Sequence, residues 1–591
     1  MKKFEQIKID GRRLTIQDAV SAARGVLKVT LQAGVKARLD KSSKQLARAV
    51  KEAITAGRDL GRKIKQLETK IGQSGQDNGK VQAEIKSLQL ELKKKMIYGV
   101  TTGFGALKKN YCESVEDARK LQKNLVLSHV CGVGDYLDEE TVRAIILLKA
   151  HHLAGGYSGV RFELVQRLVD ILNAGIVPLI PEQGSVGASG DLAPLAHLAL
   201  AVIGEEVETD SGRMKTIRYQ GKEYASIAEV KNRYRGEKML QKIEDSFALD
   251  FKEGLALLNG TEVMTAIALL AYQEAVNLVN WADAIGAVTL ESILGSSRAF
   301  DKVVFTVYKH KGATESAENV RKMIKDSALV NQNENVHDPY SVRCIPQVHG
   351  AVRDCLDFIG RILGEHLNSV VDDPIIFNPA EIKKNSPLDG LKERLHFEEG
   401  HFHGEPVAFA MDLLGIVLAE IGSISERRIQ LLLDPNHNNG LPAFLVQNHK
   451  GLNTGYMLAQ YTAASLVSEN KILAHPASVD SIPTSANTED HVSMGTIAAR
   501  KAKQIVQHTA TILAIELLCA TEALSFRLGE QIFEKAQVKG KPGRLSFRLY
   551  QKMRETVHLL RGEDRVIYPF IQRSISIIRN RRFDPLVDKP R

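Results

Sequence analysis

Apolar residues recur every three or four positions along most of the chain beyond residue 95. This spacing is typical of helices that bury one face or are buried all round. The predicted helices are Glu116–Ser128, Glu140–Ala154, Asp191–Glu205, Val263–Ile293, Val407–Leu433, Tyr456–Leu473 and Ser493–Leu528. Strand-like runs are few, and Val303–Tyr308 is one candidate. The pattern predicts a mainly α fold whose core is a bundle of long helices.

A further helical pattern lies closer to the start of the chain. Apolar residues repeat at i, i+4, i+7 and i+11 in two runs, which are Leu60, Ile64, Leu67 and Ile71, then Val81, Ile85, Leu88 and Leu92. Between the runs lies Gly72–Gly79, which is rich in turn-forming residues. This arrangement predicts an antiparallel helical hairpin, inserted into the chain between residues 41 and 95.

The net charge of the chain is concentrated in this helical hairpin. The whole chain carries a formal charge of +9, and residues 41–95 hold 14 Lys and Arg against 6 Asp and Glu, a local charge of +8. A basic hairpin could grip RNA, an acidic partner or a membrane surface. It has no aromatic residues to stack on bases. This favours a solvated structural insertion and argues against a nucleic-acid partner.

The composition predicts an ordinary globular protein of the cytoplasm. Hydrophobic residues make up 44% of the chain and charged residues 25%. The first residues lack an apolar segment of the secretory type. The nearly uncharged stretches Leu192–Gly204 and Leu413–Leu418 fall short of the 18 or so residues that a membrane span needs, so no membrane association is expected. The five cysteines are scattered without a CxxC pair, which fits reduced thiols.

The densest cluster of small residues is Gly184–Pro194, which precedes an apolar helix. Its backbone N–H groups could cradle a phosphate, although the lysine of a P-loop is missing. Alternatively, Ser189 or Asp191 could cap the helix that follows. In a third interpretation the backbone at Ala188-Ser189-Gly190 bends so tightly that the nitrogen of Gly190 attacks the carbonyl carbon of Ala188. Loss of water would then leave an electrophilic methylene on an imidazolone ring.

The motif Gly187–Pro194 strongly resembles that of the aromatic amino acid ammonia-lyases. Members of this family carry the cofactor 4-methylidene-imidazole-5-one (MIO), formed autocatalytically from the residues that match Ala188, Ser189 and Gly190. Four further motifs occur in the family's order, and these are Tyr98–Gly105, Leu257–Thr261, Tyr340–Cys344 and Phe402–Pro406. The resemblance extends from about residue 96 to 530. It implies a carbon–nitrogen lyase that eliminates ammonia from an amino acid.

The resemblance also implies roles for individual residues. Ser189 supplies the methylene of the cofactor, and Asn259 stabilises the cofactor's oxygen. Tyr98 removes the β-proton of the substrate, although its role could be exchanged with that of Tyr340. Because an ordinary tyrosine has a pKa near 10, we expect Tyr98 to lie near positive charge or another tyrosine.

The remaining roles concern substrate binding. Arg343 would clamp the substrate carboxylate, and Phe402 would line the pocket.

Three places resemble the members of the family that act on histidine. These are Leu127–His129, Ser468–Asn487 and Glu489–Met494. A carboxylate at Glu469 and an imidazole at His129 would suit the donor and acceptor nitrogens of a substrate imidazole. The resemblance therefore implies non-oxidative elimination of ammonia from L-histidine to give trans-urocanate, a step of histidine catabolism.

Two departures from the family's pattern keep other substrates open. His337 stands where the family usually has Gln, close to the expected substrate site, and Thr101 stands where members that act on histidine commonly have Asn. They motivate a tyrosine or other aromatic ammonia-lyase, or an aromatic aminomutase, as alternatives. A third alternative is a lyase-like scaffold that acts mainly as a binding protein through its basic hairpin.

The resemblance completes the predicted organisation of the chain. We expect a cofactor-bearing domain over residues 1–258, a long-helix bundle over 259–530 and a C-terminal helical segment over 531–591. Thr209–Gly236 and Asn378–Glu393 are predicted surface excursions. The family implies a homotetramer in which neighbouring chains complete each site.

Two histidine-rich segments raise the question of a metal. His401, His403 and Glu405 alternate along the chain, and His151 and His152 are adjacent. No HExxH motif or cysteine cluster accompanies them. We therefore predict no catalytic metal.

Overall fold

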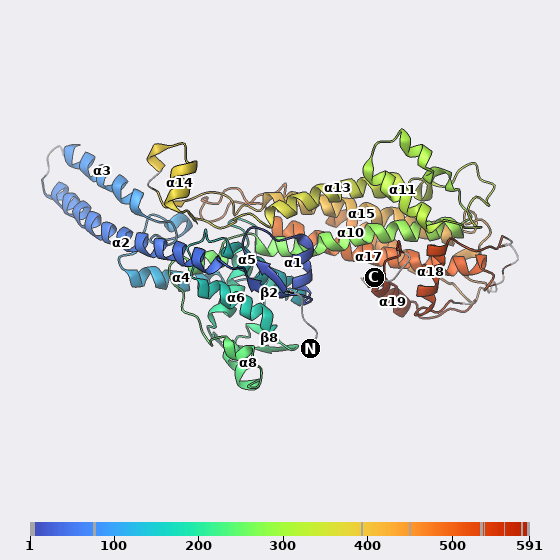
Figure 1. The fold of residues 1–591 in the computed structure, drawn as a ribbon, viewed down its shortest axis with the longest axis horizontal. Coiled ribbons are helices and arrows are strands. Elements are labelled where there is room, and N and C mark those ends of the chain that lie inside the picture. The colour runs from blue at the N-terminus through green and yellow to red at the C-terminus, as the bar shows by residue number, and fades with distance from the viewer. Residues whose placement is uncertain are drawn as a thin grey trace. The chain divides into compact units, whose positions relative to one another are not determined.

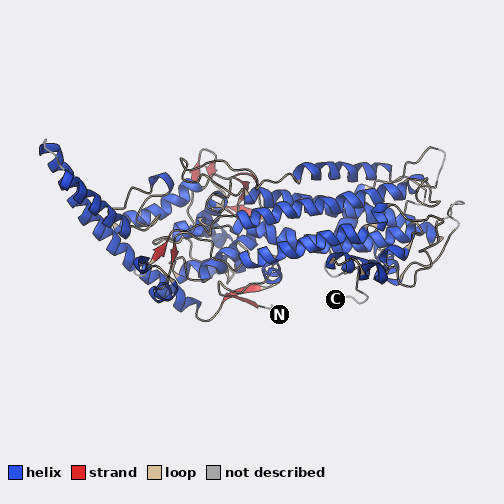
Figure 2. Cartoon of the chain, turned by 90° about the horizontal axis from the view of Figure 1, so that it is seen from above, coloured by secondary structure: helices blue, strands red, loops and turns tan. Residues whose placement is uncertain are grey.

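The fold is mainly α, as predicted. The computed structural model describes residues 6–587 except 75–78, 392–393, 448–450, 532, 534–535, 537, 561 and 581–582. Helices dominate these residues, and the strands among them are short, as Figure 2 shows. All five cysteines are free.

The described chain packs into two compact units, which interleave along the sequence. The first unit comprises Met1–Leu270, Leu363–Phe409 and Ala477–Ala499, and the second comprises Ala271–Ile362, Ala410–Pro476 and Arg500–Arg591. Four long helices contribute residues to both units, and these are α10 (Glu262–Ser292), α13 (Ile345–His366), α15 (Glu405–Leu433) and α17 (Gly495–Arg527). The division into three continuous domains, over residues 1–258, 259–530 and 531–591, stays a prediction.

Most of the first unit consists of helices, shown as coiled ribbons in Figure 1, whose lengths range from six to 40 residues. They are α1 (Ile16–Ala23), α2 (Val35–Ser74), α3 (Gly79–Lys95), α4 (Val115–His129), α5 (Glu139–Ala154), α6 (Phe162–Ala174), α7 (Leu192–Ile203), α8 (Ile227–Arg233), α9 (Glu253–Leu258) and α14 (Pro379–Asn385). Side-chain caps fix several of their first residues, because Ser114 accepts a hydrogen bond from the N–H of Asp117 and Asp138 accepts one from Thr141. Of the predicted helices, α4, α5 and α7 lie within two residues of their expected ends.

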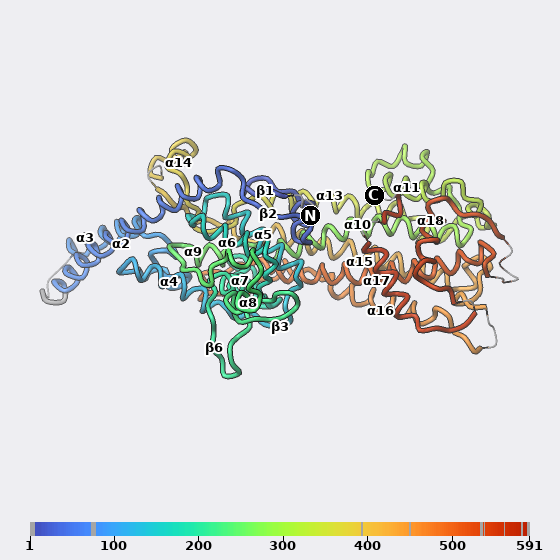
Figure 3. Tube along the Cα trace, turned by 60° about the horizontal axis from the view of Figure 1, so that its bottom comes forward, coloured from blue at the N-terminus to red at the C-terminus, as the bar shows by residue number. Residues whose placement is uncertain are grey.

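Small sheets accompany these helices. Strands β1 (Gln6–Ile9) and β2 (Lys28–Leu31) pair in parallel, whereas all other pairs are antiparallel. Those pairs join β3 (Val133–Tyr136) to β5 (Pro181–Gln183), β4 (Val177–Pro178) to β8 (Ile217–Tyr219) to β9 (Lys222–Tyr224), β6 (Glu208–Thr209) to β7 (Gly212–Arg213), and β10 (Ile375–Ile376) to β11 (His396–Phe397). Figure 3 shows the hairpin of β6 and β7 projecting from the rest of the first unit, within the predicted excursion Thr209–Gly236.

The predicted helical hairpin consists of α2 and α3, which pack side by side (Figure 1). The first half of α2 joins a buried cluster through Leu46, Val50 and Ile54. Beyond Ile64 the described side chains of α2 are exposed or half-buried. The hairpin therefore has a base that is part of the core and a solvated distal part. Residues 75–78 of the predicted turn lie outside the described residues.

The second unit contains most of the residues of the four long helices. Its other helices are α11 (Lys311–Met323), α12 (Tyr340–Arg343), α16 (Met457–Leu473), α18 (Arg544–Arg554) and α19 (Tyr568–Ile578). A buried network crosslinks α15 and α17, because Arg428 contacts Glu516 through two nitrogens at 2.6 and 2.8 Å. Neither side chain is exposed, so this charge pair is satisfied inside the bundle.

The predicted strand Val303–Tyr308 is wrong, because the segment forms a 3₁₀ helix over Lys302–Thr306. Asp301 caps it by accepting a hydrogen bond from the N–H of Val303 at 2.9 Å. The side chains of Val303 and Val307 are exposed, so the run of β-branched residues has no sheet to pack on.

Three helices exceed the apolar lengths expected from the sequence. Among the described residues, α10, α15 and α17 are long and apolar enough to cross a membrane by length and composition alone. The most apolar windows of these helices are 67%, 67% and 94% buried inside the protein. Their apolar character is therefore largely used in internal packing.

Candidate active site

The segment Ala188-Ser189-Gly190 forms a tight turn directly before α7. Gly187 and Gly190 have φ angles of +70° and +71°, a conformation that side chains with a Cβ rarely adopt. Gly190 pairs with Gly260 as an isolated β-bridge, and a Cβ at position 190 would lie 2.0 Å from the carbonyl oxygen of Gly260. The turn therefore requires glycine at position 190.

Asp191 holds this turn from a fully buried position. Its carboxylate accepts hydrogen bonds from Ser185 Oγ at 2.9 Å, from the N–H of Met264 at 2.8 Å and from Thr496 Oγ1. Burial raises the pKa of Asp191 to about 6, against the effect of these hydrogen bonds. Asp191 stands at the N-cap position of α7 but its side chain does not cap the helix. The helix-cap interpretation of the motif is therefore wrong for Asp191.

Ser189 faces Asn259. Its hydroxyl donates a hydrogen bond to Asn259 Oδ1 at 2.6 Å. The amide of Asn259 donates to the carbonyl oxygen of Asp373 at 2.9 Å, and Lys149 Nζ donates to the carbonyl oxygen of Asn259 at 2.6 Å. Asn259 is thus fixed from two sides.

These residues fit a group formed from the backbone of the triplet. Gly190 presents no side chain that would obstruct its own nitrogen, and Gly260 lies against it. Ser189 is half-buried, and its hydroxyl is held by Asn259. An Asn side chain at this position is a neutral donor and acceptor next to the atoms that would change.

Tyr98 lies in the loop between α3 and α4. Its hydroxyl accepts a hydrogen bond from the N–H of Gly105 at 3.0 Å, and its ring meets Phe104 edge-on. Burial raises the pKa of Tyr98, the Gly105 hydrogen bond lowers it, and the carboxylates of Asp373 and Glu489 raise it further. We expected positive charge or another tyrosine beside Tyr98. The charged side chains that act on its pKa, Asp373 and Glu489, are acidic, and a neighbouring tyrosine stays a prediction.

His129 ends α4 and shares a neighbour with Tyr98. Its Nδ1 lies 3.0 Å from Ser128 Oγ. Burial lowers the pKa of His129, while a hydrogen bond to the carbonyl of Leu125 and the charge of Glu489 raise it. Glu489 therefore acts electrostatically on both His129 and Tyr98, and the structure brings the three together.

Glu489 was missed as a site residue, although the stretch Glu489–Met494 had been singled out. Its carboxylate accepts a hydrogen bond from Thr484 Oγ1 at 2.8 Å, across a short turn. Ser485, Ala486 and Asn487 in that turn all have positive φ angles. A non-glycine run in this conformation is strained and held by its surroundings, which is a mark of functional loops.

Further carboxyl groups close to Asn259 were also missed. Asp372 contacts Lys252 at 2.5 Å, with both side chains buried. Burial raises the pKa of Asp373 to about 7 and that of Glu399 to about 7. The N–H of Glu399 donates to Asp373 Oδ1 at 3.1 Å, so the two groups are neighbours. Carboxyl groups with raised pKa values cluster at functional sites.

Phe402 is half-buried in the segment that leads into α15, within the first unit. The other predicted site residues belong to the second unit, and these are His337, Tyr340, Arg343 and Glu469. Arg343 lies over the ring of Tyr340 at 5.0 Å, and His337 and Tyr340 line a cavity of about 440 Å³. Glu469 is 53% exposed, and its carboxylate lies 3.9 Å from His508 Nε2.

The helical fold and the serine-bearing turn agree with a known class of lyase. The family model for aromatic amino acid lyases matches residues 62–555. The chain belongs to the aromatic amino acid lyase family.

Two relatives within this family are similar to the chain over nearly its whole length. The histidine ammonia-lyase of Caldanaerobacter subterraneus subsp. tengcongensis is 44% identical over 586 residues, which cover 99% of this chain and 98% of the relative. That of Alkaliphilus oremlandii is 39% identical and covers 97% of each chain.

Solved structures agree with this family membership. The structure of histidine ammonia-lyase from Trypanosoma cruzi has a TM-score of 0.74 at 32% identity, covering 97% of this chain and 93% of the other. That of tyrosine aminomutase from Streptomyces globisporus has a TM-score of 0.77 at 30% identity, covering 97% and 96%.

Proposed function

We propose that this protein is a histidine ammonia-lyase, which eliminates ammonia from L-histidine and releases trans-urocanate. The observation that carries this proposal is the turn at Ala188-Ser189-Gly190, closed against Gly260 with Ser189 bonded to Asn259. Relatives that share 38–46% of their residues with this chain bear the same name.

The proposed cofactor is MIO, formed from Ala188, Ser189 and Gly190. When formed, it supplies an electrophile for the substrate amine, which turns a poor leaving group into a better one. Asp191 keeps the turn compressed through its three buried hydrogen bonds. Asn259 would hold the cofactor's oxygen as a neutral hydrogen-bond donor.

Tyr98 is the proposed base for the β-proton. The N–H of Gly105 fixes the phenol oxygen and favours its ionised form. The carboxylates of Asp373 and Glu489 oppose ionisation. An ionised Tyr98 in this surrounding is a strong base, and it becomes available when cationic groups of the substrate or protein offset the carboxylates.

Recognition of the imidazole ring is assigned to His129 and Glu469, with His337 beside the carboxylate-binding pair. Arg343 would bind the substrate carboxylate, and Tyr340 stacks on it. We propose that neighbouring chains complete the site in a homotetramer, as the family resemblance implies. We further propose that the enzyme acts in the cytoplasm.

The departure at Thr101 weighs little against histidine. Thr101 is buried, and its hydroxyl accepts a hydrogen bond from the N–H of Ile97 at 2.9 Å. Its side chain therefore stabilises the turn that carries Tyr98. An aromatic aminomutase remains the second candidate, because the solved tyrosine aminomutase has the same fold at a TM-score of 0.77.

The decisive experiment is near-ultraviolet absorbance of the purified protein with L-histidine, L-tyrosine and L-phenylalanine in separate cuvettes. A new band of a conjugated acid with histidine alone supports the proposal. A band with tyrosine instead would assign a tyrosine ammonia-lyase. No band with any substrate, together with a β-amino acid product, would assign an aminomutase.

The role of Ser189 is tested with a matched pair of serine variants. Ser189→Ala removes the side chain that provides the methylene and should abolish turnover. Ser211→Ala, in the exposed turn between β6 and β7, should leave it unchanged. Appreciable turnover by Ser189→Ala would overturn the cofactor assignment.

A further inference from the structure

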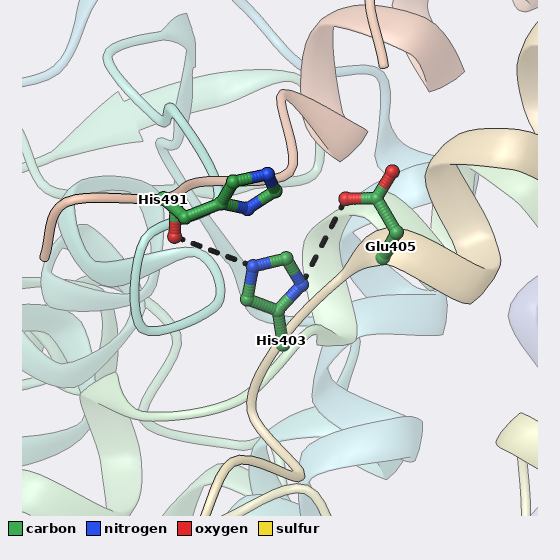
Figure 4. A group of neighbouring side chains, drawn as sticks. All are labelled: His403, Glu405 and His491. Atoms are coloured by element: carbon green, nitrogen blue, oxygen red, sulfur yellow. Dashed lines mark hydrogen bonds and ion pairs between the residues drawn. The ribbon is translucent and has the colours of Figure 1, made fainter. Parts of the chain in front are cut away.

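Three potential metal ligands converge beside the loop that precedes α17 (Figure 4). They are His403 in the segment before α15, Glu405 at the first residue of α15, and His491. One nitrogen or oxygen atom from each lies within 4.8 Å of the others. All three residues belong to the first unit. His491 is 86 positions beyond Glu405, so the sequence motif His401-x-His403-x-Glu405 did not reveal this group.

The hydrogen bonding of His403 determines which of its nitrogens is free to bind. Its Nε2 lies 3.3 Å from the carbonyl oxygen of His491. A carbonyl oxygen can only accept, so in this contact Nε2 carries the proton. In a neutral ring, Nδ1 then has a lone pair, and this atom lies 3.9 Å from the carboxylate of Glu405.

A lone pair that faces a carboxylate is repulsive unless a cation lies close to both. A metal ion bound by both groups would remove this repulsion. Metal-bound histidines characteristically donate their second ring N–H to a carbonyl or carboxylate, which is the arrangement found at His403. The ring of His491 stacks against that of His403 with 5.7 Å between centroids, and one of its nitrogens lies within 4.8 Å of the ligand atoms of His403 and Glu405.

We propose that His403, Glu405 and His491 bind one divalent transition-metal ion, for which Zn²⁺ is the best-matched probe. Two imidazoles and one carboxylate are ligands that Zn²⁺ prefers, with water in the fourth position. Zn–N and Zn–O bonds of about 2.0–2.2 Å require donors no more than roughly 4 Å apart. Since His491 is exposed, rotation of its side chain can supply the remaining approach.

Such an ion would join two segments that frame the serine-bearing turn. Val492 and Met494, directly after His491, pack against Ala188 in one buried cluster. The N–H of Met494 also donates to the carbonyl oxygen of Val186 at 2.9 Å. The ion would thus fix the loop before α17 to the start of α15. This role is structural and does not depend on the proposed function.

The test measures Zn²⁺ binding by the full-length protein after treatment with a chelator. Competition with a chromophoric chelator gives the affinity, and elemental analysis after desalting gives the stoichiometry. We expect one tight site per chain. His491→Asn and Glu405→Gln should each weaken it at least tenfold, as expected when one ligand of a three-residue set is lost. His401→Asn is the matched control and should bind as the parent does.

Two further readouts keep the test independent of misfolding and of catalysis. Co²⁺ in place of Zn²⁺ should give the intense visible absorption of a tetrahedral site in the parent and not in His491→Asn. Zn²⁺ should raise the melting temperature of the parent and of His401→Asn only.

Equal binding by the parent and both ligand variants would overturn the proposal. So would the absence of a tight site in the parent.

Discussion

Glu489 is the residue whose charge reaches two predicted site residues at once. Its carboxylate raises the pKa of both Tyr98 and His129. For the phenol this disfavours the ionised base, whereas for the imidazole it favours the charged form. A single carboxylate therefore influences the proposed proton transfer and the proposed recognition of the substrate ring.

The substitution Glu489→Gln should lower the pKa of Tyr98, because a charge that opposes ionisation is removed. If ionised Tyr98 is the base, the rise of kcat/KM with pH should move to lower pH by roughly 0.5–1 unit. The measurement is a pH profile of kcat/KM for histidine. Glu208→Gln, in the exposed strand β6, is the control and should keep the parental profile. An unshifted profile in Glu489→Gln would separate Glu489 from the ionisation of Tyr98.

Gly190→Ala should prevent formation of the proposed cofactor. The new Cβ would lie 2.0 Å from the carbonyl oxygen of Gly260, in a backbone conformation with φ of +71°. We expect loss of turnover and of any near-ultraviolet absorbance that belongs to the proposed cofactor.

The control for Gly190→Ala is Gly212→Ala. Gly212 has φ of +105°, but no atom lies within 4 Å of its Cβ position. Gly212→Ala should lower the free energy of unfolding by about 1 kcal/mol and leave the activity unchanged. Full activity in Gly190→Ala would contradict the requirement for glycine at position 190.

At the residue scale, the motifs were enough to predict Ser189, Asn259 and Tyr98 as a group, and the structure places Ser189 against Asn259. The carboxyl groups around them were not predicted. Asp373 and Asn259 are 114 positions apart, and isolated acidic residues give no pattern. The acidic charges that surround Tyr98 were not predicted either, because charge at a site depends on which distant segments meet there.

At the scale of elements, the helical hairpin of α2 and α3 combines two different structural roles. Leu46 and Val50 are buried in a core cluster with Ile97 and Phe251. The distal part, beyond Ile64, contacts mainly the partner helix of the hairpin. Its basic residues are solvated on the described surface.

Removing residues 66–84 and closing the gap with a short glycine-rich turn should leave the fold and turnover intact. The described side chains of the removed segment are exposed or half-buried, so they contribute little to the core of the first unit. Leu46→Ala, at the base, should cost about 2–5 kcal/mol of stability because it opens a buried cavity. Thermal unfolding and turnover are the measurements.

Loss of turnover in the shortened protein would assign the distal hairpin a part in the active enzyme. Intact turnover with loss of an interaction would favour the binding role of the basic segment.

Long periodic elements were the predictable part of the fold. Helices α10, α15 and α16 each start and end within two residues of their predicted bounds. Strands of two to four residues carry too few positions for alternation to show, so the small sheets were not predicted. The run Val303–Tyr308 has strand-forming residues, but Asp301 caps a 3₁₀ helix there. The cap from Asp301 therefore outweighed the strand propensity of the β-branched residues.

At the scale of the whole molecule, the predicted site residues divide between the two compact units. Ser189, Asn259 and Tyr98 lie in the first unit, and Tyr340 and Arg343 lie in the second. The mainly α class and the family could be predicted from the sequence. The division of the site residues between two units could not be predicted, because each unit is assembled from three separate stretches of chain.

A homotetramer with shared sites predicts complementation between inactive variants. Ser189→Ala and Arg343→Ala should each be inactive alone. Co-expressed chains should regain a measurable fraction of turnover, because some sites then combine an intact Ser189 with an intact Arg343 from a neighbour. Light scattering should give a mass near four times 65.2 kDa. A monomer, or a tetramer without complementation, would contradict shared sites.

The contacts of Asp191 set an order for folding and cofactor formation during synthesis of the chain. Its partner Thr496 lies 305 positions further along the chain, and Met264 lies 73 positions further. While the ribosome is still adding residues before 496, the turn lacks one of the bonds that compress it. If compression drives ring closure, Ser189 remains an unmodified serine in chains that have not yet reached residue 496. The proposed cofactor then forms only in chains in which the segment with Thr496 has packed against the turn. Its presence would therefore indicate that folding is complete.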